Sequence, residues 1–101
     1  RSVRASLGIL HFRRGLYAVA EADLAWVCDR DESNGPAFYY RGEALNRLGR
    51  YDEAMQVLER AIVLQPHNAK AFYTLGHLYD RKHMGEDAAI MYRRARELSR
   101  G

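Results

Sequence analysis

The sequence has one cysteine and no long hydrophobic run, and each shortage excludes a class of protein. A single cysteine cannot form a disulfide within the chain, which excludes the small secreted folds that depend on disulfides. No apolar stretch approaches the roughly 20 residues of a membrane span, and no secretory signal is visible. A glycine-rich phosphate loop and an activated serine or cysteine signature are also missing, so we expect no enzymatic activity from these residues.

Cys28 falls late on an apolar helix face, where we expect a buried and unreactive thiol. A reducing compartment fits such a cysteine best, and we take the cytoplasm as the expected location. The chain begins with Arg1 rather than Met and ends with Gly101, one residue short of three periods of the repeat described below. We therefore expect a fragment cut at repeat boundaries from a longer protein.

The charged residues limit the choice of partner. The net charge is +3, and all of this excess lies in residues 69–101, which carry seven basic and four acidic side chains. This small excess argues against nucleic acid, although RNA binding stays a third hypothesis that a steep salt dependence would reveal. Fourteen of the sixteen cations are arginine, which favours directional contacts to carboxylates.

The four histidines give no metal-binding pattern. His67, His77 and His83 have neither the i, i+4 spacing nor the short-loop spacing of a zinc site, and we expect no metal and no cofactor. His11 is interpreted as a core residue, and His77 as a hydrogen-bonding side chain of a binding groove.

The sequence does contain a repeat of 34 residues. The same or similar residue types recur at this spacing: Gly8, Gly42 and Gly76; Ala20, Ala54 and Ala88; Leu24, Leu58 and Tyr92; Val27, Ala61 and Ala95. A fixed period in the range of 20–50 residues indicates a stacked repeat array. The three periods, residues 1–34, 35–68 and 69–101, are expected to form one continuous domain.

Each period predicts a helical hairpin. In the middle period an amphipathic run from Pro36 to Leu48 reaches a break at Gly49, and a second run from Asp52 to Leu64 precedes a proline. The other predicted helices include residues 3–13, 17–30 and 86–100. The side chains expected on the inner faces are Val3, Leu7, Gly8, Leu10, His11, Ala20, Leu24, Val27, Cys28, Phe38, Leu45, Leu48, Ala54, Leu58, Ala61, Ile62, Leu64, Phe72, Leu75, Gly76, Tyr79, Ala88, Tyr92, Ala95 and Leu98.

The turn of the third hairpin differs from the other two. Lys82-His83-Met84-Gly85 replaces Leu48-Gly49-Arg50-Tyr51, so the glycine arrives two residues late. We expect this turn to be looser than the others.

The recurring residues resemble the tetratricopeptide repeat family, whose pattern is Trp-x2-Leu-Gly-x2-Tyr, then Ala-x3-Phe, then Pro. The middle period matches it with Phe38, Arg41, Gly42, Leu45, Ala54, Leu58 and Pro66, and the third with Phe72, Leu75, Gly76, Tyr79, Ala88 and Tyr92. The resemblance implies an all-α, right-handed superhelical array of three antiparallel helix-turn-helix hairpins. Arg41 departs from leucine, and we expect its stem to lie on the core with its guanidinium in solvent.

The resemblance also implies a concave binding surface lined by the first helix of each hairpin. Carried over to this chain, the expected surface comprises Ala5, Ile9, Phe12, Arg13, Tyr39, Glu43, Asn46, Arg47, Lys70, Tyr73, His77, Asp80 and Arg81. The expected function is a non-enzymatic protein–protein interaction module, or adaptor, which holds a peptide or helical segment of a partner. Ile9, Phe12, Tyr39 and Tyr73 would act as its anchors.

Arg13, Arg47 and Arg81 recur at the repeat spacing and form a candidate basic row for an acidic ligand, although they could equally serve solubility. Chaperone-binding members of the family hold a carboxylate with a clamp of lysines, asparagines and an arginine. Those positions fall on Ala5, Ile9, Tyr40, Lys70 and Thr74, and only Lys70 fits. The resemblance thus argues against binding of heat-shock chaperone tails.

The alternative function is a structural scaffold that self-associates through an uncapped C-terminal helix. The apolar side chains on this helix are Ile90, Met91, Ala95 and Leu98, and nothing in the sequence follows to cover them. Either a further helix follows in a longer chain, or two copies cover each other's ends as a homo-oligomer.

Overall fold

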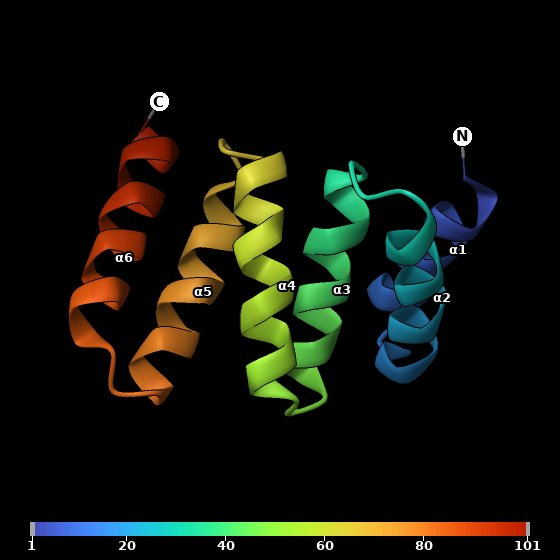
Figure 1. Ribbon diagram of the computed structural model, residues 1–101, viewed down its shortest axis with the longest axis horizontal. Helices are drawn as coiled ribbons and strands as arrows, with labels where there is room; N and C mark the ends of the chain where they lie inside the picture. Colours follow the sequence, from blue (N-terminus) through green and yellow to red (C-terminus); the bar gives the residue numbers. More distant parts are fainter. Residues whose placement is uncertain (1, 101) are drawn as a thin grey trace.

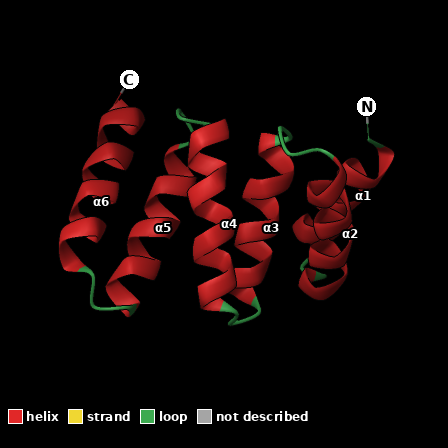
Figure 2. Cartoon of the chain, in the orientation of Figure 1, coloured by secondary structure: helices red, strands yellow, loops and turns green. Residues whose placement is uncertain are grey.

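The computed structural model describes residues 2–100 of the chain and consists of helices joined by short turns (Figure 1). The six helices are α1 (Val3–Arg13), α2 (Tyr17–Arg30), α3 (Gly35–Arg47), α4 (Tyr51–Leu64), α5 (Ala69–Arg81) and α6 (Gly85–Arg100). Among the described residues there is no strand (Figure 2). The predicted helix ends agree with the observed ones to within one residue.

The helices form three hairpins, α1–α2, α3–α4 and α5–α6, which stack in chain order along the longest axis of the molecule (Figure 1). Each helix packs against the next, and α3 also contacts α1. The array measures 37 × 28 × 23 Å. This is a helical solenoid, as the repeat period predicts.

The recurring small residues lie where the two helices of a hairpin approach each other. A Cβ atom added to Gly42 would lie 2.5 Å from Cγ of Leu58, and one added to Gly76 would lie 2.6 Å from Cε1 of Tyr92. Such distances are too short for non-bonded carbon atoms, so only glycine allows this approach. Ala20, Ala54 and Ala88 are likewise buried. The 34-residue spacing thus marks the same helix–helix contact three times.

The third turn has the same backbone hydrogen bonds as the other two, although His83 stands where they have Gly15 and Gly49. His83 takes a left-handed backbone with φ of 60°, where Gly15 and Gly49 have φ values of 78° and 77°. The amide of Met84 donates to the carbonyl of Tyr79 at 2.9 Å, as Arg50 does to Leu45. The backbone path is thus kept, and a non-glycine residue takes a conformation that side chains disfavour. The expected looseness of this turn stays a prediction.

The prediction of an inward-facing Val3, Leu7 and Leu10 is wrong. These side chains are 82%, 41% and 42% exposed, while Ala5 and Gly8 are the buried residues of α1. The physical reason lies in the stacking. Positions Ala37 and Ala71, which correspond to Val3 in the later hairpins, are fully buried by the hairpin before them, and no described helix precedes α1.

Leu48 was also expected in the core, but it forms the C-cap of α3 and is 36% exposed. The remaining predicted core is largely confirmed, with Leu24, Leu45, Leu58 and Leu75 fully buried. Cys28 is buried as expected, and this burial raises the pKa of its thiol to about 11. A thiol with so high a pKa is unreactive at neutral pH.

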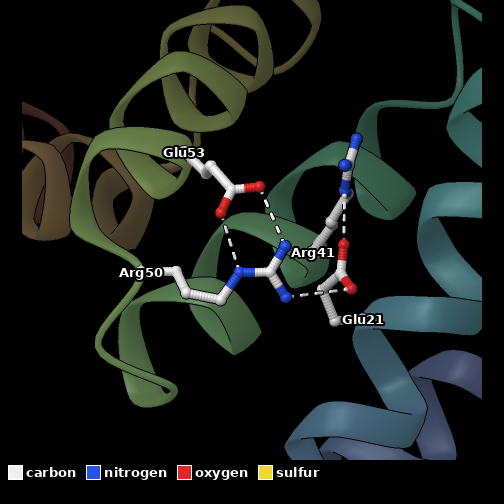
Figure 3. Close-up of polar contacts among 4 residues, drawn as sticks. All are labelled: Glu21, Arg41, Arg50 and Glu53. Carbon is white, nitrogen blue, oxygen red and sulfur yellow. Dashed lines mark hydrogen bonds and ion pairs between the residues drawn. The ribbon is translucent and has the colours of Figure 1, made fainter.

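Arg41 does not extend into solvent as predicted (Figure 3). Its Nε donates to Glu21 of the preceding hairpin at 3.2 Å, and only 22% of its side chain is exposed. Glu21 also accepts a hydrogen bond from Arg50 at 3.4 Å, and Arg50 forms two further bonds of 2.8 Å to Glu53. This network of four charged residues joins α2 to α3 and to the start of α4.

Candidate binding surface

A groove of about 950 Å³ lies across the three hairpins. It is lined by residues of α1, α3 and α5 and of the loop before α5, namely Ile9, Phe12, Arg13, Pro36, Tyr39, Tyr40, Glu43, Arg47, Gln65, Asn68, Lys70, Tyr73 and Thr74. We call it the concave groove. Eight of the predicted site residues lie in its wall, and they come together because the first helices of the hairpins stack on one side of the array.

Aromatic side chains form most of the apolar wall. Phe12 packs edge-on against Tyr17 and Tyr40, with ring centres 5.4 Å apart in both pairs. Tyr39 packs in the same way against Tyr40 at 4.9 Å. Tyr73 stands apart from this cluster and is 55% exposed. The groove wall thus combines a packed aromatic cluster with one accessible tyrosine.

Three cations line the groove, and two of them are held by aromatic neighbours. Arg47 donates to the hydroxyl of Tyr17 at 2.6 Å and lies 5.5 Å from the ring centre of Phe12. Arg13 lies 5.8 Å from the ring centre of Tyr40. Lys70 is exposed. These three cations outnumber the single carboxylate in the wall.

Glu43, predicted as a partner-binding residue, is instead buried between two hairpins. It is only 6% exposed and accepts a hydrogen bond of 2.6 Å from the hydroxyl of Thr74. Burial raises the pKa of Glu43, although the Thr74 bond and the nearby Arg47 and Lys70 oppose this shift. Burial and the same carboxylate also raise the pKa of Tyr39. Glu43 therefore connects α3 to α5, and its carboxylate has little surface left for a ligand.

Ala5 and four other predicted residues lie outside the groove wall. Ala5 is one of the buried residues of α1, and Asn46 is half-buried. Asp80 accepts a hydrogen bond of 2.9 Å from Tyr92, and Arg81 stacks 3.9 Å from the ring centre of Tyr51 on α4. His77 lies in a second groove, described below. The predicted row of three arginines is thus split, because the third one reaches back to the preceding hairpin.

Sequence reasoning missed part of the wall. Gln65 and Asn68 belong to the loop before α5, and only the first helices of the hairpins were considered. Asn68 also caps α5 by accepting from the amide of Ala71 at 3.2 Å, as Asn34 does for α3 with Ala37 at 3.1 Å. The repeated asparagine before each helix was the available signal for both caps.

A second groove, of about 730 Å³, lies between α5 and α6, and we call it the end groove. Its lining residues are Ala69, Lys70, Tyr73, His77, Tyr92, Ala95, Arg96, Ser99 and Arg100. Tyr92 is one of these residues, and partial burial and its hydrogen bond to Asp80 raise the pKa of its hydroxyl to about 12.

The apolar face predicted for α6 is partly covered. Ile90 is 47% exposed, but Ala95 is only 5% exposed and Met91 packs against the central core cluster. Leu98 is half-buried. Met91, Ala95 and Leu98 recur at i, i+4 and i+7 and share one face of α6, whereas exposed Ile90 lies to the side of that face. The alternative hypothesis of self-association through this helix stays a prediction.

His11 is half-buried on α1 and bonded to a carboxylate. Its Nδ1 lies 2.9 Å from Asp23, which also accepts a hydrogen bond of 2.9 Å from Arg4. Burial disfavours the charged form of Asp23, but the bonds from Arg4 and His11 outweigh it and lower the pKa of Asp23.

Within residues 2–100 no three His, Cys, Asp or Glu side chains gather in a way that could hold a metal ion. None of the described helices has the length and hydrophobicity needed to cross a membrane.

Two family models match the sequence, and both describe the tetratricopeptide repeat. One covers residues 6–69 and the other residues 45–100. A TPR repeat-containing protein of Methanocaldococcus jannaschii is 50% identical over 34 residues, which are 34% of this chain and 10% of that protein. Protein unc-45 homolog B of Xenopus tropicalis is 32% identical over 68 residues, which are 67% of this chain and 7% of that protein. The chain thus spans a tenth or less of these two relatives.

Solved structures give a similar result. MamA AMB-1 superposes on this chain with a TM-score of 0.88 at 28% identity, covering 98% of this chain and 54% of its own. The type III secretion translocator chaperone SycD of Yersinia enterocolitica has a TM-score of 0.87 at 20% identity, with 94% and 66% covered. The chain therefore spans about half of the MamA chain, and the likeness to SycD concerns the fold alone.

Proposed function

Since the chain belongs to the tetratricopeptide repeat family, we propose that it is a protein-interaction module whose concave groove holds a short segment of a partner protein. The observation that carries this proposal is the groove wall itself, in which aromatic rings and three cations from different hairpins face one space of about 950 Å³. Solenoids of this kind generally bind through the concave surface rather than catalyse reactions.

The wall favours a particular ligand chemistry. Tyr73 and the edge of the Phe12 cluster can pack against apolar side chains, while Lys70, Arg13 and Arg47 can pair with carboxylates. We assign Glu43 no contact with the ligand, because its carboxylate already accepts a hydrogen bond from the hydroxyl of Thr74. We therefore propose a peptide that combines one or two apolar anchors with Asp or Glu residues.

Tyr73 and Lys70 are the most informative residues to change, because both are exposed and neither supports the core. Tyr39 packs against the core cluster, so its loss would confound binding with stability. Short random peptides displayed on phage would be selected for binding to the chain. The affinities of the tightest binders would then be measured by calorimetry. We expect selected peptides to be acidic, and Tyr73→Ala with Lys70→Ala to weaken them by about 2–4 kcal/mol together.

The matched control is Val63→Ala on α4, because Val63 is 65% exposed and lies outside the groove. This variant should bind as the wild type does, and circular dichroism should show equal helicity for all variants. Selected peptides that bind both variants equally well, or that show no preference for acidic residues, would contradict the proposal.

A further inference from the structure

Two arginines of the concave groove contact one pair of aromatic rings, and each reaches across the junction between the first two hairpins. Arg13 of α1 lies 5.8 Å from the ring centre of Tyr40 on α3. Arg47 of α3 lies 5.5 Å from the ring centre of Phe12 on α1. The rings of Phe12 and Tyr40 pack against each other with centres 5.4 Å apart. The two guanidinium groups therefore belong to one cluster, although they are a full repeat apart in the sequence.

Neither of these arginines has a carboxylate partner. Arg13 and Arg47 form no ion pair with another residue between positions 2 and 100. Glu21 is the first acidic residue of the sequence, and both it and Asp23 already pair with other arginines. Glu43, the acidic residue in the described groove wall, is only 6% exposed. The cluster thus has positive charge that a ligand can neutralise.

The aromatic neighbours also hold the two guanidinium groups in place. The hydroxyl of Tyr17 accepts a hydrogen bond of 2.6 Å from Nη1 of Arg47, and the hydroxyl of Tyr40 accepts one of 3.4 Å from Arg13. A guanidinium group has five N–H donors, so most donors of each arginine stay available to a ligand. Side chains that are already held lose less conformational entropy on binding.

Two such arginines fit a phosphate group better than a carboxylate. A carboxylate has a single charge and two oxygens, and one guanidinium group can pair with both oxygens. A phosphorylated side chain has a charge of about −1.5 to −2 at pH 7 and three acceptor oxygens. It can therefore accept hydrogen bonds from both arginines at once, whereas an Asp or Glu residue leaves one of them unpaired.

We propose that Arg13 and Arg47 bind a phosphorylated serine, threonine or tyrosine of the partner segment, so that phosphorylation of the partner strengthens its binding. This inference rests on the proposed function, because the concave groove has to hold the segment that carries the phosphate. Lys70 and Tyr73 of α5 remain the contacts for an acidic and an apolar residue of the same segment.

The probe is an array of short random peptides, each made in matched versions with phosphoserine, phosphothreonine, phosphotyrosine, serine or glutamate at the central position. The affinities of the tightest binders for the 101-residue chain would be measured by fluorescence anisotropy. A phosphorylated version should bind at least about tenfold more tightly than its glutamate version, a difference of about 1.4 kcal/mol. The serine version should bind more weakly than either.

Three variants locate the contact. Arg13→Gln and Arg47→Gln should each bring the phosphorylated and glutamate versions to about the same affinity. Arg14→Gln is the matched control, because Arg14 is exposed, follows Arg13 directly and lies outside the groove wall. It should leave the preference for phosphate unchanged. All three arginines are exposed, so thermal unfolding of these variants should be close to that of the wild type.

A further variant separates the forked donor set from the charge alone. Arg47→Lys keeps the positive charge but cannot form paired hydrogen bonds, so it should keep the binding of glutamate versions and reduce the preference for phosphate. A preference that is unchanged in Arg47→Lys and in Arg47→Gln would show that this side chain does not contact the phosphate, and would overturn the inference.

The results separate this inference from the proposed function. Glutamate versions that bind as tightly as the phosphorylated ones would overturn the phosphate site and leave the concave groove as a peptide site. No binding of either version would overturn both. A preference for phosphate that Arg14→Gln abolishes would place the phosphate outside the groove and overturn the inference alone.

Other sources of phosphate are tested in the same assay. Aromatic rings beside cations also bind single-stranded nucleic acid, so an RNA oligomer is included as a competitor together with inorganic phosphate. Neither should displace a phosphorylated peptide at equal concentration, because neither offers an apolar side chain to Tyr73. An RNA oligomer that binds more tightly than the phosphorylated peptides, and that Arg13→Gln and Arg47→Gln both weaken, would overturn the inference in favour of nucleic acid.

Discussion

At the junction between the first two hairpins, Arg41 of α3 reaches back to Glu21 of α2, and both side chains are largely withdrawn from water (Figure 3). At the next junction the position of Arg41 is occupied by Leu75, which is fully buried. The position of Glu21 is occupied by Met55, which packs against the same core cluster. One repeat geometry is therefore maintained once by an ion pair and once by an apolar contact.

This difference shows which part of the repeat is geometrically required. Gly42 and Gly76, each next to the junction position in sequence, are needed within their own hairpins because a Cβ atom would clash with the second helix of the hairpin. The neighbouring position tolerates an arginine as well as a leucine, provided that the preceding helix supplies a suitable partner. Since a partly buried ion pair contributes little beyond its desolvation penalty, we expect the apolar junction to be the more stable one.

The largest effect is expected from breaking the apolar junction. Leu75→Ala removes a fully buried side chain and leaves a cavity between α4, α5 and α6, which should lower the free energy of unfolding by about 2–5 kcal/mol. Urea denaturation followed by circular dichroism measures this loss. The exposed control Val63→Ala should change stability by no more than about 0.5 kcal/mol. A loss below about 1 kcal/mol for Leu75→Ala would mean that the second junction is not the main stabilising contact.

Breaking the charged junction should have a smaller effect. Glu21→Ala leaves the half-buried Arg41 without its carboxylate, and we expect a loss of about 1–3 kcal/mol, below the value for a fully buried pair. Glu53→Ala is the matched control, because it removes an exposed carboxylate that pairs with Arg50 and should destabilise the chain less than Glu21→Ala does. Urea denaturation again gives both values. Equal losses for the two variants would show that the partial burial of Glu21 has no energetic consequence.

The two junctions can also be made alike. Arg41→Leu combined with Glu21→Met copies the Leu75–Met55 pair into the first junction. Because apolar replacement of an ion pair is often neutral or stabilising, the double variant should be at least as stable as the wild type, by thermal unfolding. Arg41→Leu alone should be less stable than the double variant, since Glu21 then loses its half-buried partner. A double variant less stable by more than about 1 kcal/mol would show that the ion pair is structurally required.

The fold could be predicted from the sequence because its determinants are local and repeated. Glycines, alanines and leucines recur every 34 residues, and each recurrence marks one helix–helix contact. The exposure of the side chains of Val3, Leu7 and Leu10 could not be predicted in this way. Their spacing is that of a buried face, but burial depends on whether another hairpin lies against α1, which the pattern within one helix does not contain.

The concave groove was predicted in outline for the same reason, since helices at equal positions of successive repeats must stack. Its details depend on contacts between residues far apart in the sequence. The bond from Thr74 that withdraws Glu43 from the surface joins residues 31 positions apart, and Arg81 turns to Tyr51 rather than to the groove. Neither interaction has a signal within a single repeat.

The smallest expected effect concerns the carboxylate at the second junction and depends on pH. Burial raises the pKa of Glu43 above its ordinary value of 4.5, so the folded chain binds this proton more tightly than the unfolded chain. The contribution of Glu43 to stability is then fully present below pH 4.5 and is lost as the pH rises through its folded pKa. Glu43→Gln removes this titration, and its amide oxygen can still accept the hydrogen bond from Thr74.

The stability of Glu43→Gln relative to the wild type should therefore increase between pH 4 and pH 7. Urea midpoints at unit steps of pH measure the difference, in which titrations shared by both chains, such as that of Asp23 at lower pH, cancel. Thr74→Val, which removes the hydroxyl donor, should raise the pKa of Glu43 further and shift the loss of stability to higher pH. A difference between Glu43→Gln and the wild type that does not vary with pH would mean that the carboxylate at this junction is ionised as freely in the folded chain as in the unfolded one. The second junction would then resemble the first in tolerating charge.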